Sequence, residues 1–235
     1  VKAGIRACSG SGSGAWLLHA PRFGQRMTSR EWRCAARYRL GLPMYTRAVP
    51  CPFCPQQLDR YGIHASHCVG AGDATHRHNM VRDVLASAAS AGRISHKLEV
   101  GYLLTDDRSG PKPADLLLYH WDGGQSVCID VSIANSFHFL TDTRPFVAME
   151  ALRHKESEKY RKYSAACAAR DLVLQPFVCG SLGGLTDVAV YVLKKLGGAV
   201  SAATGRSRER VIADLRSQIA FVVQKAQATA WLRRG

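Results

Sequence analysis

No apolar run in the sequence approaches the ~20 residues that a membrane-spanning helix needs, and no secretory signal is present. We therefore expect no membrane partner. The chain begins with Val1 rather than Met, from which we expect a fragment, a processed product or a domain cut from a longer polypeptide. Its 235 residues, 46% of them hydrophobic, suffice for one large domain, or one domain with an appendage, around a buried core.

Acidic residues are scarce, because 18 Asp and Glu stand against 32 Lys and Arg, which gives a net charge of +14. Within residues 1–60 the ratio is ten basic residues to two acidic ones. Such a surface suits a polyanion, either nucleic acid or an acidic membrane face. Nothing in the sequence resembles a lipid-binding amphipathic anchor, so nucleic acid is favoured. The alternative is a basic surface that only keeps the chain soluble.

Closely spaced cysteines are also rare, since only Cys51 and Cys54 of the eight cysteines form a close pair. This spacing favours a reducing, intracellular compartment and one metal site over a disulfide framework. The thiols expected to be free and buried in apolar surroundings are those of Cys8, Cys34, Cys128, Cys167 and Cys179.

The close pair opens a motif with metal-ligand spacing. Cys51-Pro52-Phe53-Cys54 is followed after nine residues by His64 and after three more by Cys68. A Cys-x2-Cys turn places two thiolates on one cation, and His-x3-Cys on a helical turn brings two further ligands to one face. We expect these four residues to bind Zn2+ tetrahedrally, in a closed site with a structural or docking role. His67 is the alternative ligand.

A basic helix is expected near the N-terminus. Thr28-Ser29-Arg30-Glu31 has the pattern of a capping box, and a helix over residues 30–40 should follow. Its buried side is predicted to carry Trp32, Ala35, Ala36 and Leu40. The other side carries arginines that would face phosphate groups or simply be solvated, namely Arg30, Arg33, Arg37 and Arg39.

A second helix is expected from His78 or Asn79 to about residue 91, after a loop over residues 70–75. Arg77 and His78 at its start are candidates for contact with nucleic acid, and a hydrogen-bonded helix N-terminus is the alternative. Residues 93–103 form a candidate strand. That strand contains Glu99, which would be a third carboxylate at a metal site.

The central stretch, residues 113–132, predicts two apolar strands joined by a turn at Asp122-Gly123-Gly124. Asp115 opens the first strand and Asp130 lies inside the second. A buried carboxylate is costly unless a cation or hydrogen-bond donors compensate it, so two of them on adjacent strands suggest Mg2+ held by oxygen ligands. Alternatively, Asp115 is a turn residue and Asp130 a paired structural charge.

The remainder of the chain predicts an α/β fold with a mixed sheet covered on its faces. A long helix over residues 145–169 carries Lys159 and Tyr163, which project from one face because they are four residues apart. A strand over residues 172–179 follows. Two further helices are expected, over residues 186–196, where Gly197-Gly198 would end the first, and over residues 206–233.

Several of these motifs occur together in one order: the Cys-Cys-His-Cys knuckle, Arg77-His78-Asn79, Lys112-Pro113-Ala114-Asp115, fourteen residues, Asp130 and then Lys159-x3-Tyr163. The arrangement resembles the C-terminal region of non-LTR retrotransposon polyproteins that carry a restriction-like endonuclease of the PD-(D/E)XK superfamily. The resemblance covers most of the chain. It implies a basic N-terminal helical segment (residues 1–48), a zinc knuckle (49–76) and a restriction-endonuclease-like α/β domain (77–235).

By that resemblance, Asp115 and Asp130 match the two acidic residues that would hold a catalytic Mg2+, and Lys159 and Tyr163 match the Lys-x3-Tyr element. Glu99 is an additional candidate. The sequence departs from the family at two points. Ala114 separates Pro113 from Asp115 where the family has Pro-Asp, and Ser132 stands where the wider superfamily has a lysine, which Lys159 could replace.

The resemblance implies a metal-dependent endonuclease that nicks DNA, in the nucleus if it acts as a retroelement enzyme. The alternative is a domesticated, non-catalytic subunit that binds RNA or DNA among other proteins of a ribonucleoprotein such as a mitochondrial ribosome. The charge of +14 and the basic N-terminal helix fit both.

Overall fold

The sheet at the centre of the computed structural model confirms the predicted strand pair. The model describes residues 8, 10, 12–19, 26–101, 103, 113–139, 147 and 149–235. Strands β4 (Leu116–Asp122) and β5 (Gln125–Ala134) pair antiparallel across the turn at Gly123 and Gly124. Strand β3 (His96–Leu98) joins β4 antiparallel, and β6 (Leu172–Gly180) joins β5 parallel. The sheet is therefore mixed, in the order β3-β4-β5-β6.

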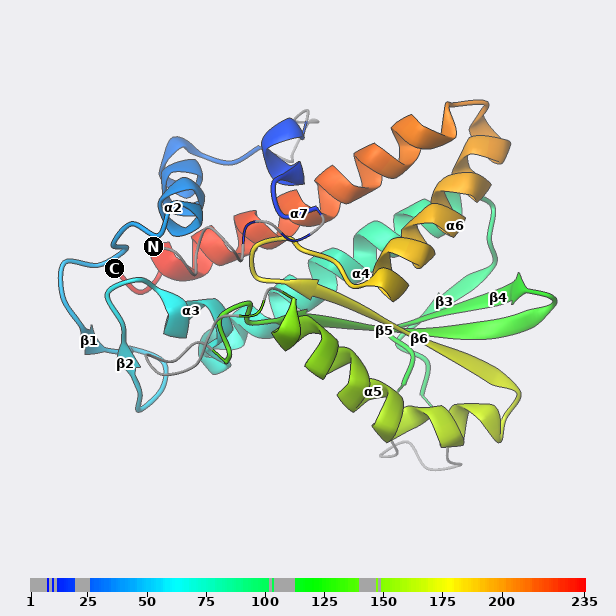
Figure 1. Cartoon of the computed structure of the whole chain (residues 1–235), viewed down its shortest axis with the longest axis horizontal. Coiled ribbons are helices and arrows are strands. Elements are labelled where there is room, and N and C mark those ends of the chain that lie inside the picture. Colours follow the sequence, from blue (N-terminus) through cyan, green and yellow to red (C-terminus); the bar gives the residue numbers. More distant parts are fainter. Residues whose placement is uncertain are drawn as a thin grey trace.

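The two faces of this sheet are covered by different helices. Val127, Ile129 and Val131 of β5 belong to the main core, which α4 (Asp73–Ala91), α6 (Asp187–Thr204) and α7 (Arg208–Leu232) complete. The alternate residues point to the other face, where Cys128 packs with Tyr163 and Cys167 of α5 (Glu150–Ala168). Figure 1 shows α5 on one side of the strands and α4 and α6 on the other. Among the described residues there are six α-helices, so the mixed α/β class is confirmed.

The N-terminal part packs against α7. A 3-10 helix, η1 (Ala15–Leu18), and α2 (Ser29–Arg39) both lie along it. The capping box of α2 is present, because Glu31 N donates to Thr28 Oγ1 and Thr28 N donates to Glu31 Oε2.

The predicted buried side of α2 was partly wrong. Trp32 is 51% exposed and Leu40 is 64% exposed, whereas Ala35 and Tyr38 are buried. The reason is the partner helix: the Tyr38 ring stacks on Trp231 of α7, with ring centroids 4.5 Å apart, and Thr229 donates to Glu31. The contact with α7 therefore selects a face that the apolar spacing within α2 does not indicate.

A small unit follows α2. Strands β1 (Val49–Pro50) and β2 (Gln57–Leu58) pair antiparallel, and α3 (Ile63–His67) and the 3-10 helix η2 (Gly70–Gly72) lead into α4. Its apolar residues join Tyr38 of α2 and Trp231 of α7 in one cluster. The predicted boundary between residues 76 and 77 lies inside α4, which is continuous from Asp73.

Several predicted ends differ from the observed ones. Helix α4 begins at Asp73, so residues 73–75 are helical rather than a loop. Strand β3 is short, and Glu99 follows it directly. Helix α5 starts at Glu150, and Lys112 and Pro145, where the helix was expected to begin, lie outside the described residues. Helix α6 continues through Gly197-Gly198 and stops at Gly205, whose φ is 71°.

None of the described helices combines the length and the apolarity that a membrane span requires.

Candidate functional site: two carboxylates, a lysine and a Cys/His cluster

The antiparallel register brings the two predicted aspartates together. Leu116 pairs with Ile129 and Leu117 with Cys128, so Asp115 directly precedes the first paired residue of β4 and Asp130 directly follows its partner on β5. The amide of Asp115 donates to Ile129 O at 3.1 Å, one residue off that register, and Val131 N donates to Asp115 Oδ2 at 2.6 Å, so Asp115 lies beside β5 next to Asp130. Asp130 shares the parity of Cys128 and therefore the sheet face that α5 covers, whereas the carboxylate of Asp115 contacts both Val131 N of β5 and His78 of α4. Two carboxyl groups thus lie close enough to interact, one just before β4 and the other within β5.

Asp130 is held in the interior by one cation. Its side chain is 5% exposed, and Lys159 Nζ lies 2.9 Å from Oδ1 and 2.9 Å from Oδ2. Burial raises the pKa of Asp130 to about 6, against the opposing effect of Lys159 and with a further upward contribution from Asp115. The carboxylate is therefore under-compensated by the described protein groups, which is the condition in which an added cation is favourable.

Asp115 uses its two oxygens in different directions. Oδ2 accepts a hydrogen bond from Val131 N at 2.6 Å, and Oδ1 lies 3.2 Å from His78 Nε2. The hydrogen bond to Asp115 raises the pKa of His78, and burial opposes it. His78, which the sequence made a candidate nucleic-acid contact, therefore lies within α4 and not at a helix N-terminus. Its ring lies beside the carboxylate of Asp115.

Tyr163 lies one helical turn beyond Lys159 on α5. Its ring is 7% exposed, with Lys159 Nζ 5.7 Å and Lys162 Nζ 4.8 Å from the ring centroid. The ring is packed against Leu117 and Cys128 of the sheet. Tyr163 thus packs beside Lys159, and no described contact joins it to the carboxylates.

Glu99 lies at the same edge as Asp115. Its amide donates to Asp115 O at 3.1 Å, and its carboxylate is paired with Arg82 of α4. A carboxylate oxygen of Glu99, a ring nitrogen of His78 and an oxygen of Asp115 lie within 4.8 Å of one another. The structure therefore brings together Asp115, Asp130, Lys159 and Glu99, and adds His78 to them.

The four predicted zinc ligands also converge. The Sγ atoms of Cys51 and Cys68 are 3.9 Å apart, those of Cys54 and Cys68 are 3.7 Å apart, and Cys54 Sγ is 3.3 Å from His64 Nε2. Thiolates bound at about 2.3 Å to one tetrahedral zinc ion lie about 3.8 Å apart. The cluster could therefore hold a zinc ion, as the spacing predicts. The alternative ligand, His67, instead directs Nδ1 at Ile63 O, at 2.8 Å.

Residues outside the motif position this cluster. Asp59 accepts hydrogen bonds from the amides of Tyr61 and His64, and Trp231 Nε1 donates to Gly62 O at 2.9 Å. Burial acts to lower the pKa of Arg234, but bonds to Asp73 and to the thiols of Cys68 and Cys51 raise it. Arg234 thus supplies positive charge beside thiol ligands. It lies far from the motif in sequence, so the ligand spacing alone could not identify it.

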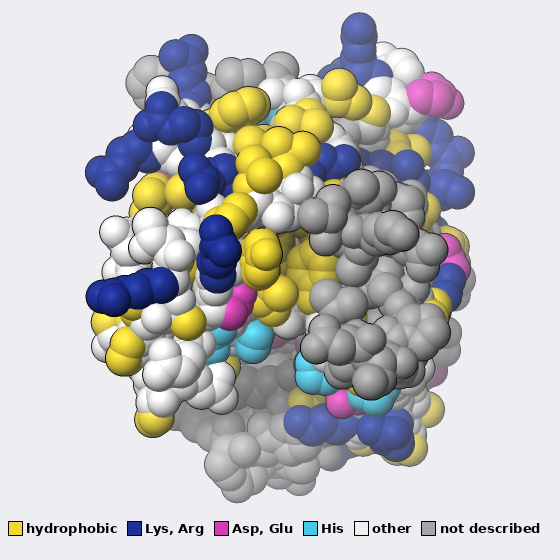
Figure 2. Space-filling view, turned by 60° about the vertical axis from the view of Figure 1, so that its left-hand side comes forward, with side chains coloured by type: hydrophobic (Ala, Val, Ile, Leu, Met, Phe, Trp, Pro, Cys, Tyr) yellow, Lys and Arg dark blue, Asp and Glu magenta, His cyan; other side chains and the backbone are white. Residues whose placement is uncertain are grey.

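The predicted nucleic-acid face is only partly exposed. Arg30, Arg33 and Arg37 of α2 are exposed, although Arg37 donates to Pro43 O, and half-buried Arg39 donates to Ser13 O. Figure 2 shows Lys and Arg side chains around a strip of hydrophobic ones on this end of the molecule.

The assignment of Arg77 to a nucleic-acid contact needs correction. Its side chain is only 3% exposed, because α4 begins at Asp73 and turns this position into the interior.

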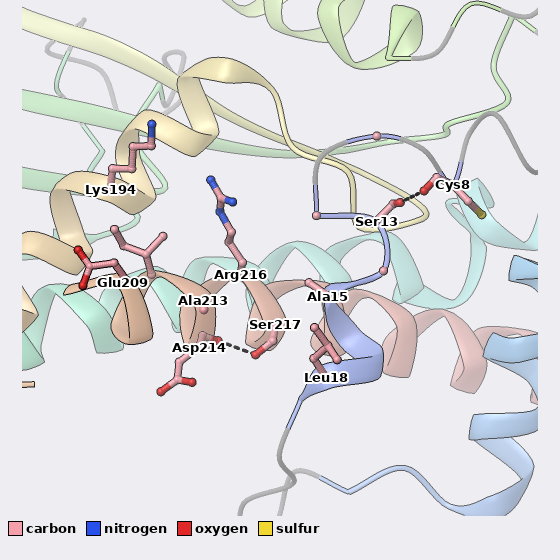
Figure 3. Close-up of a pocket in the computed structure, with 14 residues that line it drawn as sticks. Cys8, Ser13, Ala15, Leu18, Lys194, Glu209, Ala213, Asp214, Arg216 and Ser217 are labelled. Carbon is pink, nitrogen blue, oxygen red and sulfur yellow. Dashed lines mark hydrogen bonds between the residues drawn. The ribbon is translucent and has the colours of Figure 1, made fainter. Parts of the chain in front are cut away.

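A hollow of about 690 Å³ lies elsewhere, between α6, α7 and the N-terminal loop that contains Gly10, Gly12, Ser13 and Gly14. Figure 3 shows Lys194 of α6 and Arg216 of α7 on its walls, with Ser13 and Ala15 opposite. Neither Asp115 nor Asp130 lines it. The candidate chemistry is therefore defined by the carboxylates on the α5 side of the sheet and not by this hollow.

Comparison with known proteins leaves this assignment to the geometry alone. No protein-family model matches the sequence, and no curated protein matches it either.

Proposed function

We propose that the chain is a metal-dependent endonuclease that nicks DNA by hydrolysing a phosphodiester bond. The observation that carries the proposal is the proximity of Asp115, just before β4, to Asp130 within β5, with Lys159 bonded to the buried Asp130. Oxygen-rich sites with two carboxylates suit Mg2+. When bound, that cation supplies positive charge to the scissile phosphate and acidifies water.

The residues of the chain have separate tasks in this proposal. Asp115 and Asp130, with the carbonyl of Val131, form the cation-binding side of the site. Lys159 orients the attacking water or offsets negative charge that develops on the phosphate. Tyr163 keeps Lys159 in place through its packed ring. The exposed arginines of α2 and the net charge of +14 hold the polyanion by phosphate contacts, which are insensitive to base sequence.

The Cys51/Cys54/His64/Cys68 cluster has a structural role in this proposal. Four protein ligands complete a tetrahedral site and leave no position open for substrate. Its contacts with Trp231 and Arg234 connect it to α7, so it fixes the basic N-terminal end relative to the sheet.

Nicking of supercoiled plasmid in Mg2+ tests the proposal. Asp130→Asn keeps the shape of the side chain but removes its charge, so we expect nicking to fall by at least ~100-fold. The matched control is Glu158→Gln, one residue from Lys159 on α5, where the acid is paired with Lys155. We expect this control to nick at the native rate.

A non-catalytic nucleic-acid-binding subunit is the second candidate. It is favoured by one feature, since both carboxylates already have basic partners, Lys159 and His78. A zinc-loaded, folded native chain that binds nucleic acid but gives no nicking in Mg2+ or Mn2+ would replace the nuclease proposal with this one.

A further inference from the structure

A second set of metal-type ligands lies beside the aspartate pair. His78 comes from α4, Glu99 follows β3, and Asp115 precedes β4, and one potential ligand atom from each lies within 4.8 Å of the others. Twenty residues separate His78 from Glu99 along the chain, and fifteen separate Glu99 from Asp115. The backbone hydrogen bond from Glu99 N to Asp115 O holds the second pair together.

The spacing of the two inner ligands fits a shared cation. His78 Nε2 and Asp115 Oδ1 are 3.2 Å apart. Two ligands bound at about 2.1 Å lie about 3.0 Å apart at a right angle and about 3.4 Å apart at a tetrahedral angle. The observed distance falls between these limits, so a cation could be inserted without displacing α4 from the sheet.

The backbone at Glu99 is also unusual, although five other described non-glycine residues share this feature. Its φ is 50°, in the left-handed region that a glutamate rarely adopts. Such a conformation costs about 1 kcal/mol or more and tends to persist at binding sites. Here it directly follows the end of β3, and the Glu99 carboxylate, which forms an ion pair with Arg82 of α4, lies within 4.8 Å of ligand atoms of His78 and Asp115.

Asp115 is shared between the two sets of ligands. Its Oδ1 faces His78, and its Oδ2 faces the amide of Val131, next to Asp130 in the strand. The nitrogen ligand distinguishes the new set chemically, because imidazole favours transition-metal cations, whereas Mg2+ prefers oxygen ligands alone.

We propose that His78, Glu99 and Asp115 form a second cation site, which takes a divalent transition metal such as Mn2+ in preference to Mg2+. This inference deepens the proposed nuclease function and rests on it for the role of the cation, which would lie beside the Asp115–Asp130 site and add positive charge to the same phosphate. The binding of the cation itself is independent of whether the chain cuts DNA.

Mn2+ binding to the zinc-loaded full chain, followed by electron paramagnetic resonance of the free ion, tests the site directly. We expect His78→Ala to weaken the affected class of Mn2+ sites by at least about tenfold, because loss of even an outer-shell partner costs about 10–100-fold in metal affinity. Glu99→Gln should weaken it in the same direction. Mg2+ affinity, measured by competition, should change less than Mn2+ affinity in His78→Ala.

The matched control is His76→Ala, since His76 is exposed on the same helix two residues away. It should bind Mn2+ as the native chain does, and unchanged zinc content and circular dichroism should show that each variant is folded. Native-like Mn2+ binding by both His78→Ala and Glu99→Gln would overturn the second site, as would the absence of any Mn2+ binding. Failure of nicking with normal, His78-dependent Mn2+ binding would instead remove the nuclease function and leave the cation site.

Discussion

At the scale of single residues, Asp130 carries a conflict between stability and the proposed chemistry. It is buried beside a second carboxylate, and Lys159 is its cationic partner. Burial raises its pKa to about 6, so the folded protein holds this proton more tightly than the unfolded chain does. Ionisation of Asp130 therefore destabilises the fold as the pH rises through the interval from about 4 to about 6.

The conflict predicts a variant that is more stable and less active. Asp130→Asn should raise the free energy of unfolding by about 1–3 kcal/mol at pH 7.5, because the native chain pays for an ionised group there and the amide does not. At pH 4.5, where the native carboxyl is mostly protonated, the gain should shrink to less than about 1 kcal/mol. Urea denaturation of both chains at the two pH values measures the difference. A gain that is equal at both would contradict the raised pKa.

Sequence alone identified the residues of this site better than their surroundings. Asp115 and Asp130 could be predicted because one carboxylate stands at the start of an apolar strand and the other inside the next strand, and the two strands pair. The contact between His78 and Asp115 could not be predicted. It depends on α4 starting at Asp73, and so on the direction in which the side chain of residue 78 points from the helix. The same early start of α4, at Asp73 rather than at residue 78 or 79, accompanies the burial of Arg77.

At the scale of elements, the passage of α6 through two glycines shows how packing overrides local propensity. Gly197 and Gly198 favour the end of a helix, yet α6 continues to Thr204. A Cβ on Gly197 would lie 2.4 Å from Ile212 Cγ1 of α7, so the missing side chain lets the two helices approach closely. The sequence signal for a helix end was thus a signal for helix contact.

This contact predicts opposite effects for two neighbouring substitutions. Gly197→Ala should destabilise the chain by about 1–3 kcal/mol, because the new methyl group overlaps Ile212. Gly198→Ala serves as the control, since its Cβ would come no closer than 3.6 Å to Arg208 and helix propensity should stabilise it by about 0.5–1 kcal/mol. Thermal unfolding of both variants measures the signs, and stabilisation by Gly197→Ala would contradict the close approach.

At the scale of the whole molecule, the Cys/His cluster joins parts of the chain that are far apart in sequence. Its apolar surroundings include Tyr38 of α2 and Trp231 of α7, and the indole of Trp231 donates to Gly62 O within the knuckle. The ligand spacing predicted the cluster, but these connections are tertiary and have no local signature. The α/β class and the mixed sheet were predictable because they follow from the order of elements.

Removal of zinc should therefore loosen more than the knuckle. We expect one zinc ion per chain, released by a chelator, with a lower Tm and faster amide exchange both at residues 51–68 and around Trp231. Cys54→Ser should lose the ion, and His67→Ala should retain it because His67 lies outside the cluster. Gently purified protein without zinc, or retention of the ion by Cys54→Ser, would contradict the assignment.

The lysine that serves Asp130 stands on a helix, while the acid stands on a strand. The gap between ammonium and carboxylate is consequently set by how deeply α5 settles on the sheet, and hence by the bulk of Cys128, Leu174 and Cys167 between them. Enlarging or trimming these buried side chains would shift the Lys159 ammonium relative to Asp130, which stays fixed by strand pairing. Core volume, with no change to any charged group, thereby becomes a means of adjusting the reactivity of this edge.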